Sequence, residues 1–198
     1  MPIKYIQIAR SMLRRFLVAA KEKNIWAATS MAFAAAKRRS VSSTRDSFDA
    51  DLGIETSYVA PLWQLNIPSP NAKFGIRYQT TEPAIFLASL RACPVQTRDF
   101  TFVDLGCGKG RTLILAAREG FKHIVGVEFS PQLAAIARKN ISQVGISAEV
   151  IETDASQYEF PDGNLLIYMY NPFGSPIVDA VIRNLMKRSE KGQDAAFV

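Results

Sequence analysis

Apolar positions repeat with two different spacings along the second half of the chain. Short apolar or alternating runs, typical of strands, occur at residues 100–105, 123–129, 148–153 and 164–171. Between and after them, apolar residues return every three or four positions, which predicts helices at residues 110–119, 130–144 and 176–188. A fifth strand begins in the final run DAAFV. Strands that alternate with single helices predict a Rossmann-like α/β fold, a parallel sheet with helices on both faces.

The residues before this pattern are less regular. Thr81 or Glu82 followed by Pro83 predicts a helix start, and the helix runs to about Cys93. Residues 53–80 have no clear period but are rich in proline and aromatic residues, so we expect an ordered loop that folds over something. Residues 38–52 are polar and serine-rich and are interpreted as a linker. The predicted division is an extension and linker at 1–50, a lid loop and helix at 51–99, and a core at 100–198.

Charge separates the extension from the rest. The chain has 198 residues and a net charge of +6, but residues 1–50 carry ten Lys/Arg against three acids and residues 51–198 carry fourteen against fifteen. The extension has a basic amphipathic helical pattern, which suits a membrane surface or nucleic acid. The favoured interpretation, however, is that its apolar face packs on its own domain or on a partner. Its second apolar patch, residues 25–36, is too short to span a bilayer.

The stretch FVDLGCGKGRT combines a carboxylate with three alternate glycines at the end of the first predicted strand. Asp104 precedes Gly106, Gly108 and Gly110, and glycines at such a turn let the backbone approach a ligand closely. The dinucleotide fingerprint G-x-G-x-x-G is not met, because its third glycine position holds Arg111. In parallel sheets, ligands bind beyond the carboxyl ends of the strands, so this turn is the predicted site.

The D-x-G-x-G-x-G spacing resembles motif I of the class I S-adenosylmethionine-dependent methyltransferases. That resemblance implies S-adenosylmethionine as the cofactor, with Asp104 near its ammonium group. Glu128, at the end of the second strand, would accept hydrogen bonds from the ribose diol. Asp154 follows the third strand, where the family usually has an acid or amide near the adenine amino group. Taken singly, these acids are equally compatible with turn caps or solvated strand ends.

Asn171-Pro172-Phe173-Gly174 closes the fourth strand and looks like the Asn/Asp-Pro-Pro-aromatic motif of methyltransferases that act on nitrogen, without its second proline. Asn171 is the predicted catalytic residue and also a predicted cofactor contact. Its side-chain carbonyl and the backbone carbonyls that follow would accept hydrogen bonds from an amine acceptor and aim its lone pair, and Phe173 would wall the acceptor. The segment RYQTTEP upstream is similar to the non-SET (Dot-type) histone lysine methyltransferases and their bacterial relatives. By that resemblance Tyr78, Thr80 and Glu82 form a lid over the cofactor. A hydrophobic staple is the alternative for Tyr78.

The favoured function is therefore methyl transfer to an undetermined acceptor, with protein lysine or another nitrogen preferred. The reaction needs no metal and no covalent nucleophile, and no general base is assigned. The alternatives are an NAD(P)-linked oxidoreductase on a similar sheet and a non-catalytic interaction module that works through the basic extension. Cys93, Cys107 and His123 form no disulfide framework or metal-ligand spacing, so buried cysteines, a structural or solvent-facing role for His123 and a cytoplasmic location are expected.

The family's sheet normally has seven strands, and this sequence supplies five at most. Because the last residues are apolar and of strand type, we expect the 198 residues to be a C-terminally truncated piece of a longer chain of the same fold. An exposed sheet edge at that end would favour association.

Overall fold

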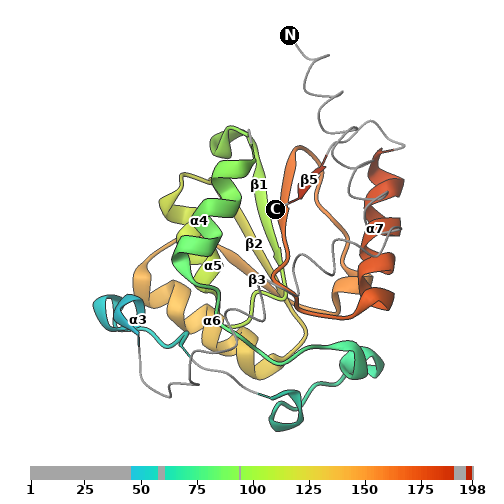
Figure 1. Ribbon diagram of the computed structural model, residues 1–198, viewed down its shortest axis with the longest axis horizontal. Coiled ribbons are helices and arrows are strands. Elements are labelled where there is room, and N and C mark those ends of the chain that lie inside the picture. The colour runs from blue at the N-terminus through green and yellow to red at the C-terminus, as the bar shows by residue number, and fades with distance from the viewer. Residues whose placement is uncertain (1–45, 58–60, 94, 190–194, 198) are drawn as a thin grey trace. The chain divides into compact units, whose positions relative to one another are not determined.

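The computed structural model describes residues 46–57, 61–93, 95–189 and 195–197 (Figure 1). The chain divides into two units, Met1–Ser42 and Ser43–Val198, and the described residues belong to the second. The amphipathic helix predicted in the basic extension lies outside the described residues, as does the start of the predicted linker.

A five-stranded sheet forms the centre of the described unit. Its order is β3-β2-β1-β4-β5, and every neighbouring pair is parallel. The predicted alternation of strands and helices is thereby confirmed as a Rossmann-like parallel sheet. The strands are β1 (Thr101–Leu105), β2 (His123–Glu128), β3 (Glu149–Glu152), β4 (Leu165–Tyr168) and β5 (Ala195–Phe197).

Helices cover both faces of the sheet, as the sequence predicts (Figure 1). Successive residues of β1 point to opposite faces, so Phe102 packs in one core cluster and Val103 in the other. The first cluster includes residues of α4 (Pro83–Ala92), α5 (Arg111–Arg118) and α6 (Pro131–Val144). The second includes residues of α7 (Ser175–Ser189) and of the short η4 turn (Ala155–Gln157).

The helix boundaries follow the expected capping signals. The Ser130 hydroxyl accepts a hydrogen bond from the Leu133 amide, and Pro131 occupies the first position of α6. Gly145 ends the same helix in the left-handed conformation. Pro83 likewise begins α4 after Glu82, whose side chain makes no capping hydrogen bond. These local signals explain why the sequence places α4 and α6 to within one or two residues.

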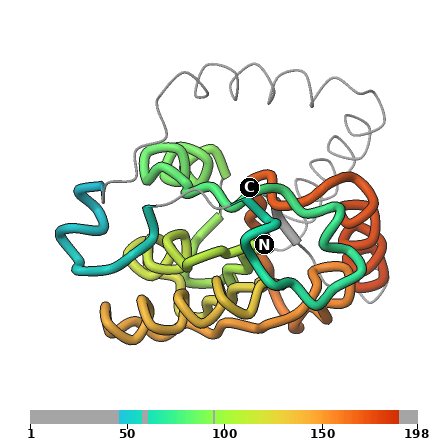
Figure 2. Tube along the Cα trace, turned by 90° about the horizontal axis from the view of Figure 1, so that it is seen from below, coloured from blue at the N-terminus to red at the C-terminus, as the bar shows by residue number. Residues whose placement is uncertain are grey.

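Residues 61–80 cross the carboxyl ends of the strands and form an ordered loop, as expected. Figure 2 shows this segment from below the view of Figure 1. It contains the turns η1 (Leu62–Gln64) and η2 (Pro70–Phe74), and Gly75 forms an antiparallel bridge with Phe173. The Ile76 amide donates to the Pro172 carbonyl at 2.9 Å, and the Gly174 amide donates to the Phe74 carbonyl at 2.7 Å. The loop is therefore tied to the turn that follows β4.

The linker prediction is wrong for residues 46–52. Ser47–Leu52 form helix α3, which begins at the capping side chain of Asp46 and ends at Gly53 with a φ of 68°. Asp49 of this helix is completely buried. The polar composition that suggested a linker instead supplies hydrogen-bonding groups for a buried contact with α5.

Two smaller expectations can be compared with the structure. Cys93 and Cys107 are free and buried, as predicted. His123 is exposed at the start of β2, in agreement with a solvent-facing role. Among the residues that the structure describes, no helix is both long and apolar enough to cross a membrane.

Candidate functional site

Two adjoining cavities lie at the carboxyl edge of the sheet. Both cavities are lined by Tyr78, Gln79, Gly106 and Tyr170. The first cavity is also lined by Glu128, Asp154 and Asn171, and the second by Thr80 and Asp104. The structure thus brings together seven predicted site residues from five separate segments. Gly108, Gly110 and Glu82 line neither cavity, and Glu82 is exposed.

Gly106, Gly108 and Gly110 have φ values of 87°, 54° and 84°, in a region of backbone conformation that residues with a side chain rarely adopt. A Cβ atom at Gly106 would lie 2.4 Å from Cβ of Pro172, and one at Gly108 would lie 2.2 Å from the ring of Tyr78. At Gly110 the nearest atom would be Cβ of Ala137, at 3.2 Å. Each glycine therefore permits a close approach, but in this structure the approaching group is a protein side chain.

Glu128 is buried at the end of β2 and organises the loop. Its two carboxylate oxygens accept hydrogen bonds from the amides of Gly108 (2.8 Å) and Ser130 (2.9 Å). Burial raises the pKa of Glu128 to about 7, although the hydrogen bonds from these amides act in the opposite direction. The side chain lines the first cavity, where the ribose was expected. The ribose contact itself stays a prediction.

Asp104 is the second buried carboxyl group of the site. It accepts a hydrogen bond from the Thr112 hydroxyl, and burial together with the charge of Glu128 raises its pKa to about 7. No ion pair among the described residues includes Asp104 or Glu128. Since both folded pKa values lie above the ordinary 3.8 and 4.5, these groups stabilise the fold most at low pH, and that contribution is lost as the pH rises through about 7.

Asp154 has a structural role that the sequence did not reveal. One oxygen accepts hydrogen bonds from the amide and hydroxyl of Ser156, and the other accepts from the side chains of Ser69 (2.7 Å) and Asn71 (2.9 Å). The carboxylate therefore caps η4 and holds the η2 turn against the sheet. The two oxygens thus already accept four hydrogen bonds. An adenine amino group would donate to Asp154 only by displacing one of these donors or by sharing an oxygen with them.

Asn171 follows β4 in an unusual conformation. Its φ of 50° is the only positive value of a non-glycine residue in the described part of the chain. The side chain is exposed at the first cavity, whereas Phe173 is buried and lines the same cavity. The carbonyl of Pro172 accepts the Ile76 amide, so one of the backbone carbonyls expected to face an amine is already used. The side-chain carbonyl of Asn171 is the remaining acceptor proposed from the sequence.

The predicted lid residues behave differently from one another. The Tyr78 ring lies against Gly108, and its hydroxyl donates to the carbonyl of Thr56 at 2.7 Å. Thr80 donates to the same carbonyl at 2.5 Å. Burial raises the pKa of Tyr78, so the phenol is a hydrogen-bond donor throughout the physiological range. Tyr78 therefore lies against the glycine loop, Thr80 lines the second cavity beside it, and Glu82 lines neither cavity.

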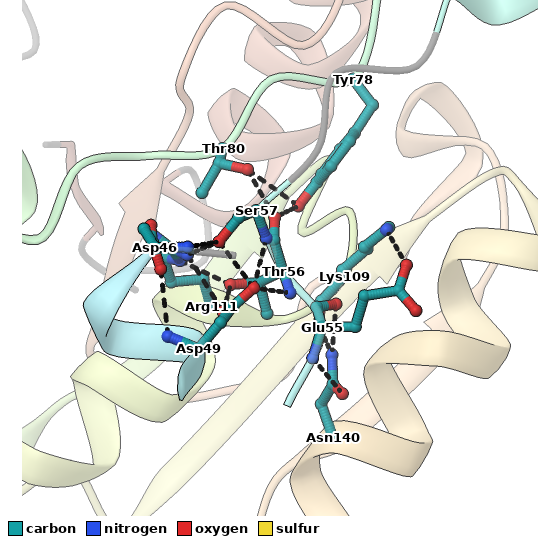
Figure 3. A network of polar contacts seen from close by, with 10 residues as sticks. All are labelled: Asp46, Asp49, Glu55, Thr56, Ser57, Tyr78, Thr80, Lys109, Arg111 and Asn140. Carbon is teal, nitrogen blue, oxygen red and sulfur yellow. Dashed lines mark hydrogen bonds and ion pairs between the residues drawn. The ribbon is translucent and has the colours of Figure 1, made fainter. Parts of the chain in front are cut away.

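The residues that sequence analysis missed are those of α3 and the following segment. The guanidinium of Arg111, the first residue of α5, is surrounded by Asp46, Asp49, Thr56 and Ser57 (Figure 3). A signal was available: Asp46 precedes the helix and Gly53 follows it, which is a standard start and stop pattern. The contact with Arg111 joins positions more than fifty residues apart and has no local signature.

Comparison with known proteins relates this chain to methyltransferases. Residues 102–191 match a family model described as a methyltransferase domain. The matched residues include the glycine loop and most of the parallel sheet, so the chain is similar to methyltransferases over this part of its core.

Its curated relatives include the ribosomal protein L11 methyltransferase of Pasteurella multocida, 28% identical over 138 residues that cover 66% of this chain and 46% of the relative. The enzyme of the same name from Dechloromonas aromatica is 36% identical over 69 residues, or 33% of this chain and 23% of that protein. The chain thus spans less than half the length of these relatives. Among solved structures, an RNA methyltransferase from Salinibacter ruber with S-adenosyl-L-homocysteine is 27% identical, with a TM-score of 0.43 over 55% of this chain and 69% of that one.

Proposed function

We propose that this protein is an S-adenosylmethionine-dependent methyltransferase. The observation that carries the proposal is the pair of buried carboxyl groups, Asp104 and Glu128, on either side of the glycine loop. Buried carboxylates without a cationic partner are costly, so a ligand with an ammonium group and a hydroxyl pair would offset that cost. Both groups occur in S-adenosylmethionine. The residues present therefore fit the cofactor.

In this proposal Asp104 holds the ammonium group, Glu128 the ribose hydroxyls, and Tyr78 and Thr80 cover the loop. When bound, S-adenosylmethionine supplies an activated methyl group on a sulfonium with a good leaving group. The task of the protein is then to align donor and acceptor and to exclude water, which contributes several kcal/mol without a metal or a nucleophilic side chain. Asn171 accepts a hydrogen bond from the acceptor amine and orients its lone pair. An amine acceptor must be neutral to react, so desolvation in the cavity has to lower its pKa.

For the acceptor we propose a nitrogen on a protein. The curated relatives are, by name, methyltransferases of a ribosomal protein. The Asn-Pro-Phe-Gly turn and the resemblance to the non-SET histone lysine methyltransferases support the same assignment. We propose that the basic extension makes peripheral contact with a membrane surface or nucleic acid and that the protein works in the cytoplasm.

Two measurements test the proposed function. Calorimetric titration should show binding of S-adenosylhomocysteine and none of NAD, whereas the reverse result would favour the oxidoreductase alternative. Incubation of the protein with methyl-labelled S-adenosylmethionine and cell extract should then label a protein band, and hydrolysis of that band should release a methylated amino acid. Label that appears only in nucleic acid or in small molecules would contradict the protein acceptor.

Cofactor binding is expected to depend on pH. If Asp104 holds the ammonium group, it must be deprotonated in the complex, and its pKa of about 7 in the free protein means that binding releases a proton below that pH. The affinity for S-adenosylhomocysteine should therefore fall by about tenfold per pH unit below 7 for one coupled proton. Titration calorimetry in buffers of different ionisation enthalpy measures both quantities. Asp104→Asn should bind weakly at every pH, and a flat profile in the wild type would contradict this role.

Asn171→Ala is expected to reduce turnover by about 10- to 100-fold with little change in cofactor affinity, because the loss is confined to the transfer geometry. Methyl transfer at saturating cofactor, together with the dissociation constant of S-adenosylhomocysteine, separates these effects. Ala148→Gly, a change near the other end of the sheet, serves as a control for general loss of stability. Normal turnover in Asn171→Ala would remove this residue from the catalytic site.

A further inference from the structure

One buried residue, Thr56, lies between the two sides of the candidate cofactor site (Figure 3). On one side is the glycine loop with Arg111 at its end, and on the other is the segment that carries Tyr78 and Thr80. Thr56 belongs to neither, because it follows α3 in the chain. We call residues 46–57 the strap.

The strap contacts the glycine-loop side through a buried charge network. The Thr56 hydroxyl accepts a hydrogen bond from Nε of Arg111 at 2.6 Å and donates to Asp49 at 2.5 Å. Nη2 of Arg111 donates to Asp49 at 3.1 Å and to Ser57 at 3.0 Å. Burial tends to raise the pKa of Asp49, but hydrogen bonds from Ser57 and Thr56 hold it below its usual value. The carboxylate is thus ionised beside the guanidinium, and Arg111 is fixed from several directions.

Thr56 also contacts the segment that carries Tyr78 and Thr80, through its backbone carbonyl. The Thr56 carbonyl accepts hydrogen bonds from the hydroxyls of both Tyr78 and Thr80. The Tyr78 ring, which lines both cavities, is therefore tethered at its far end while its edge rests on Gly108. A shift of Thr56 would move the ring relative to the loop.

A second connection lies one residue along the strap. Glu55 forms an ion pair with Lys109 of the glycine loop, at 2.5 Å. The Asn140 side chain of α6 donates to the carbonyls of both Glu55 and Lys109, at 3.0 Å each. The loop from Gly106 to Arg111 is thus held to the strap at Lys109 as well as at Arg111.

We propose that Thr56 is a positioning residue of the cofactor site: it fixes the distance between the Tyr78 side and the glycine loop and thereby sets cofactor affinity. The proposal rests on the proposed function. It goes beyond that function because no predicted site residue lies in the strap. Thr56 lines neither cavity, so its effect is exerted through Tyr78 and Arg111.

The test compares three variants of the full chain. Thr56→Val keeps the shape of the side chain but removes the hydroxyl between Asp49 and Arg111, and Thr56→Ser restores it. Leu185→Ala, in the core on the α7 face, lowers stability without contact with the strap. Each variant is titrated with S-adenosylhomocysteine by calorimetry. The amide resonance of Gly108 is followed in ¹⁵N-glycine-labelled protein without ligand, because the ring of Tyr78 on this residue shifts its resonance.

Thr56→Val should weaken S-adenosylhomocysteine binding by about tenfold, and Thr56→Ser by no more than about threefold, a separation well above the error of the titration. Leu185→Ala should bind like the wild type. The Gly108 resonance should move in Thr56→Val alone. Wild-type affinity in Thr56→Val, or equal weakening in Leu185→Ala, would overturn the proposal. If the wild-type chain binds no S-adenosylhomocysteine, the proposed function fails; an unshifted Gly108 resonance overturns the positioning role by itself.

Discussion

Asp49→Asn is expected to lower the free energy of unfolding by about 3–5 kcal/mol, the cost of breaking a buried charge pair from one side. Asp49 is completely buried and accepts hydrogen bonds from the amides and hydroxyls of Thr56 and Ser57. Asparagine has the same shape, but its amide group is a donor and would face these donors. The substitution also leaves the buried guanidinium of Arg111 without its closest buried carboxylate. Urea denaturation followed by circular dichroism measures the loss.

Glu152→Gln provides a matched control for this prediction. Glu152 pairs with Arg138 at 3.6 Å, but both side chains are more than two-fifths exposed. Pairs of this kind contribute about 0–1 kcal/mol, so the control should unfold close to the wild type. Equal small effects in the two variants would show that the buried contact of Asp49 with Arg111 does not contribute to stability.

Much of the fold could be predicted because its signals are local. The change from strand-like runs to helical spacing marks each strand and each α-helix between Phe100 and Ser189, and Ser130-Pro131 identifies one helix start to the residue. α3 was missed although it has a capping aspartate and a terminal glycine. Its six residues are too short for an apolar period, and its one fully buried side chain is an aspartate, with Phe48 only partly buried against the core. A helix that is anchored by charge has no hydrophobic pattern to detect.

The candidate site was predictable for a topological reason. The carboxyl ends of parallel strands meet at one edge, so Asp104, Glu128 and Asn171 had to lie near one another once the strands were identified. What those side chains contact could not be deduced. Two of the partners of Asp154, Ser69 and Asn71, lie more than eighty residues earlier in the chain. Likewise, the ring that covers Gly108 comes from Tyr78 in the crossing loop. Such contacts depend on the conformation of a loop whose sequence has no periodic pattern.

Gly108→Val is expected to reduce affinity for S-adenosylhomocysteine by at least about 100-fold, which corresponds to about 2.7 kcal/mol. The φ of Gly108 is 54°, and a Cβ atom there would lie 2.2 Å from Cε2 of Tyr78. The valine side chain therefore has to displace the ring, and Tyr78 lines both cavities. Whichever way the ring moves, the space over the loop that the cofactor needs is reduced. Calorimetry at protein concentrations well above the wild-type dissociation constant measures the loss.

Gly145→Val separates this effect from backbone strain. Gly145 ends α6 with a φ of 73°, and a Cβ atom there would meet nothing within 4 Å. Both variants place a β-branched residue in the left-handed region, at a cost of about 1–3 kcal/mol of stability, but only one of them changes the cavities. We therefore expect backbone strain to lower the thermal stability of both variants, a further loss of stability in Gly108→Val from the displaced Tyr78 ring, and a loss of binding in Gly108→Val alone. If Gly108→Val binds S-adenosylhomocysteine as tightly as Gly145→Val does, the glycine loop does not hold the cofactor.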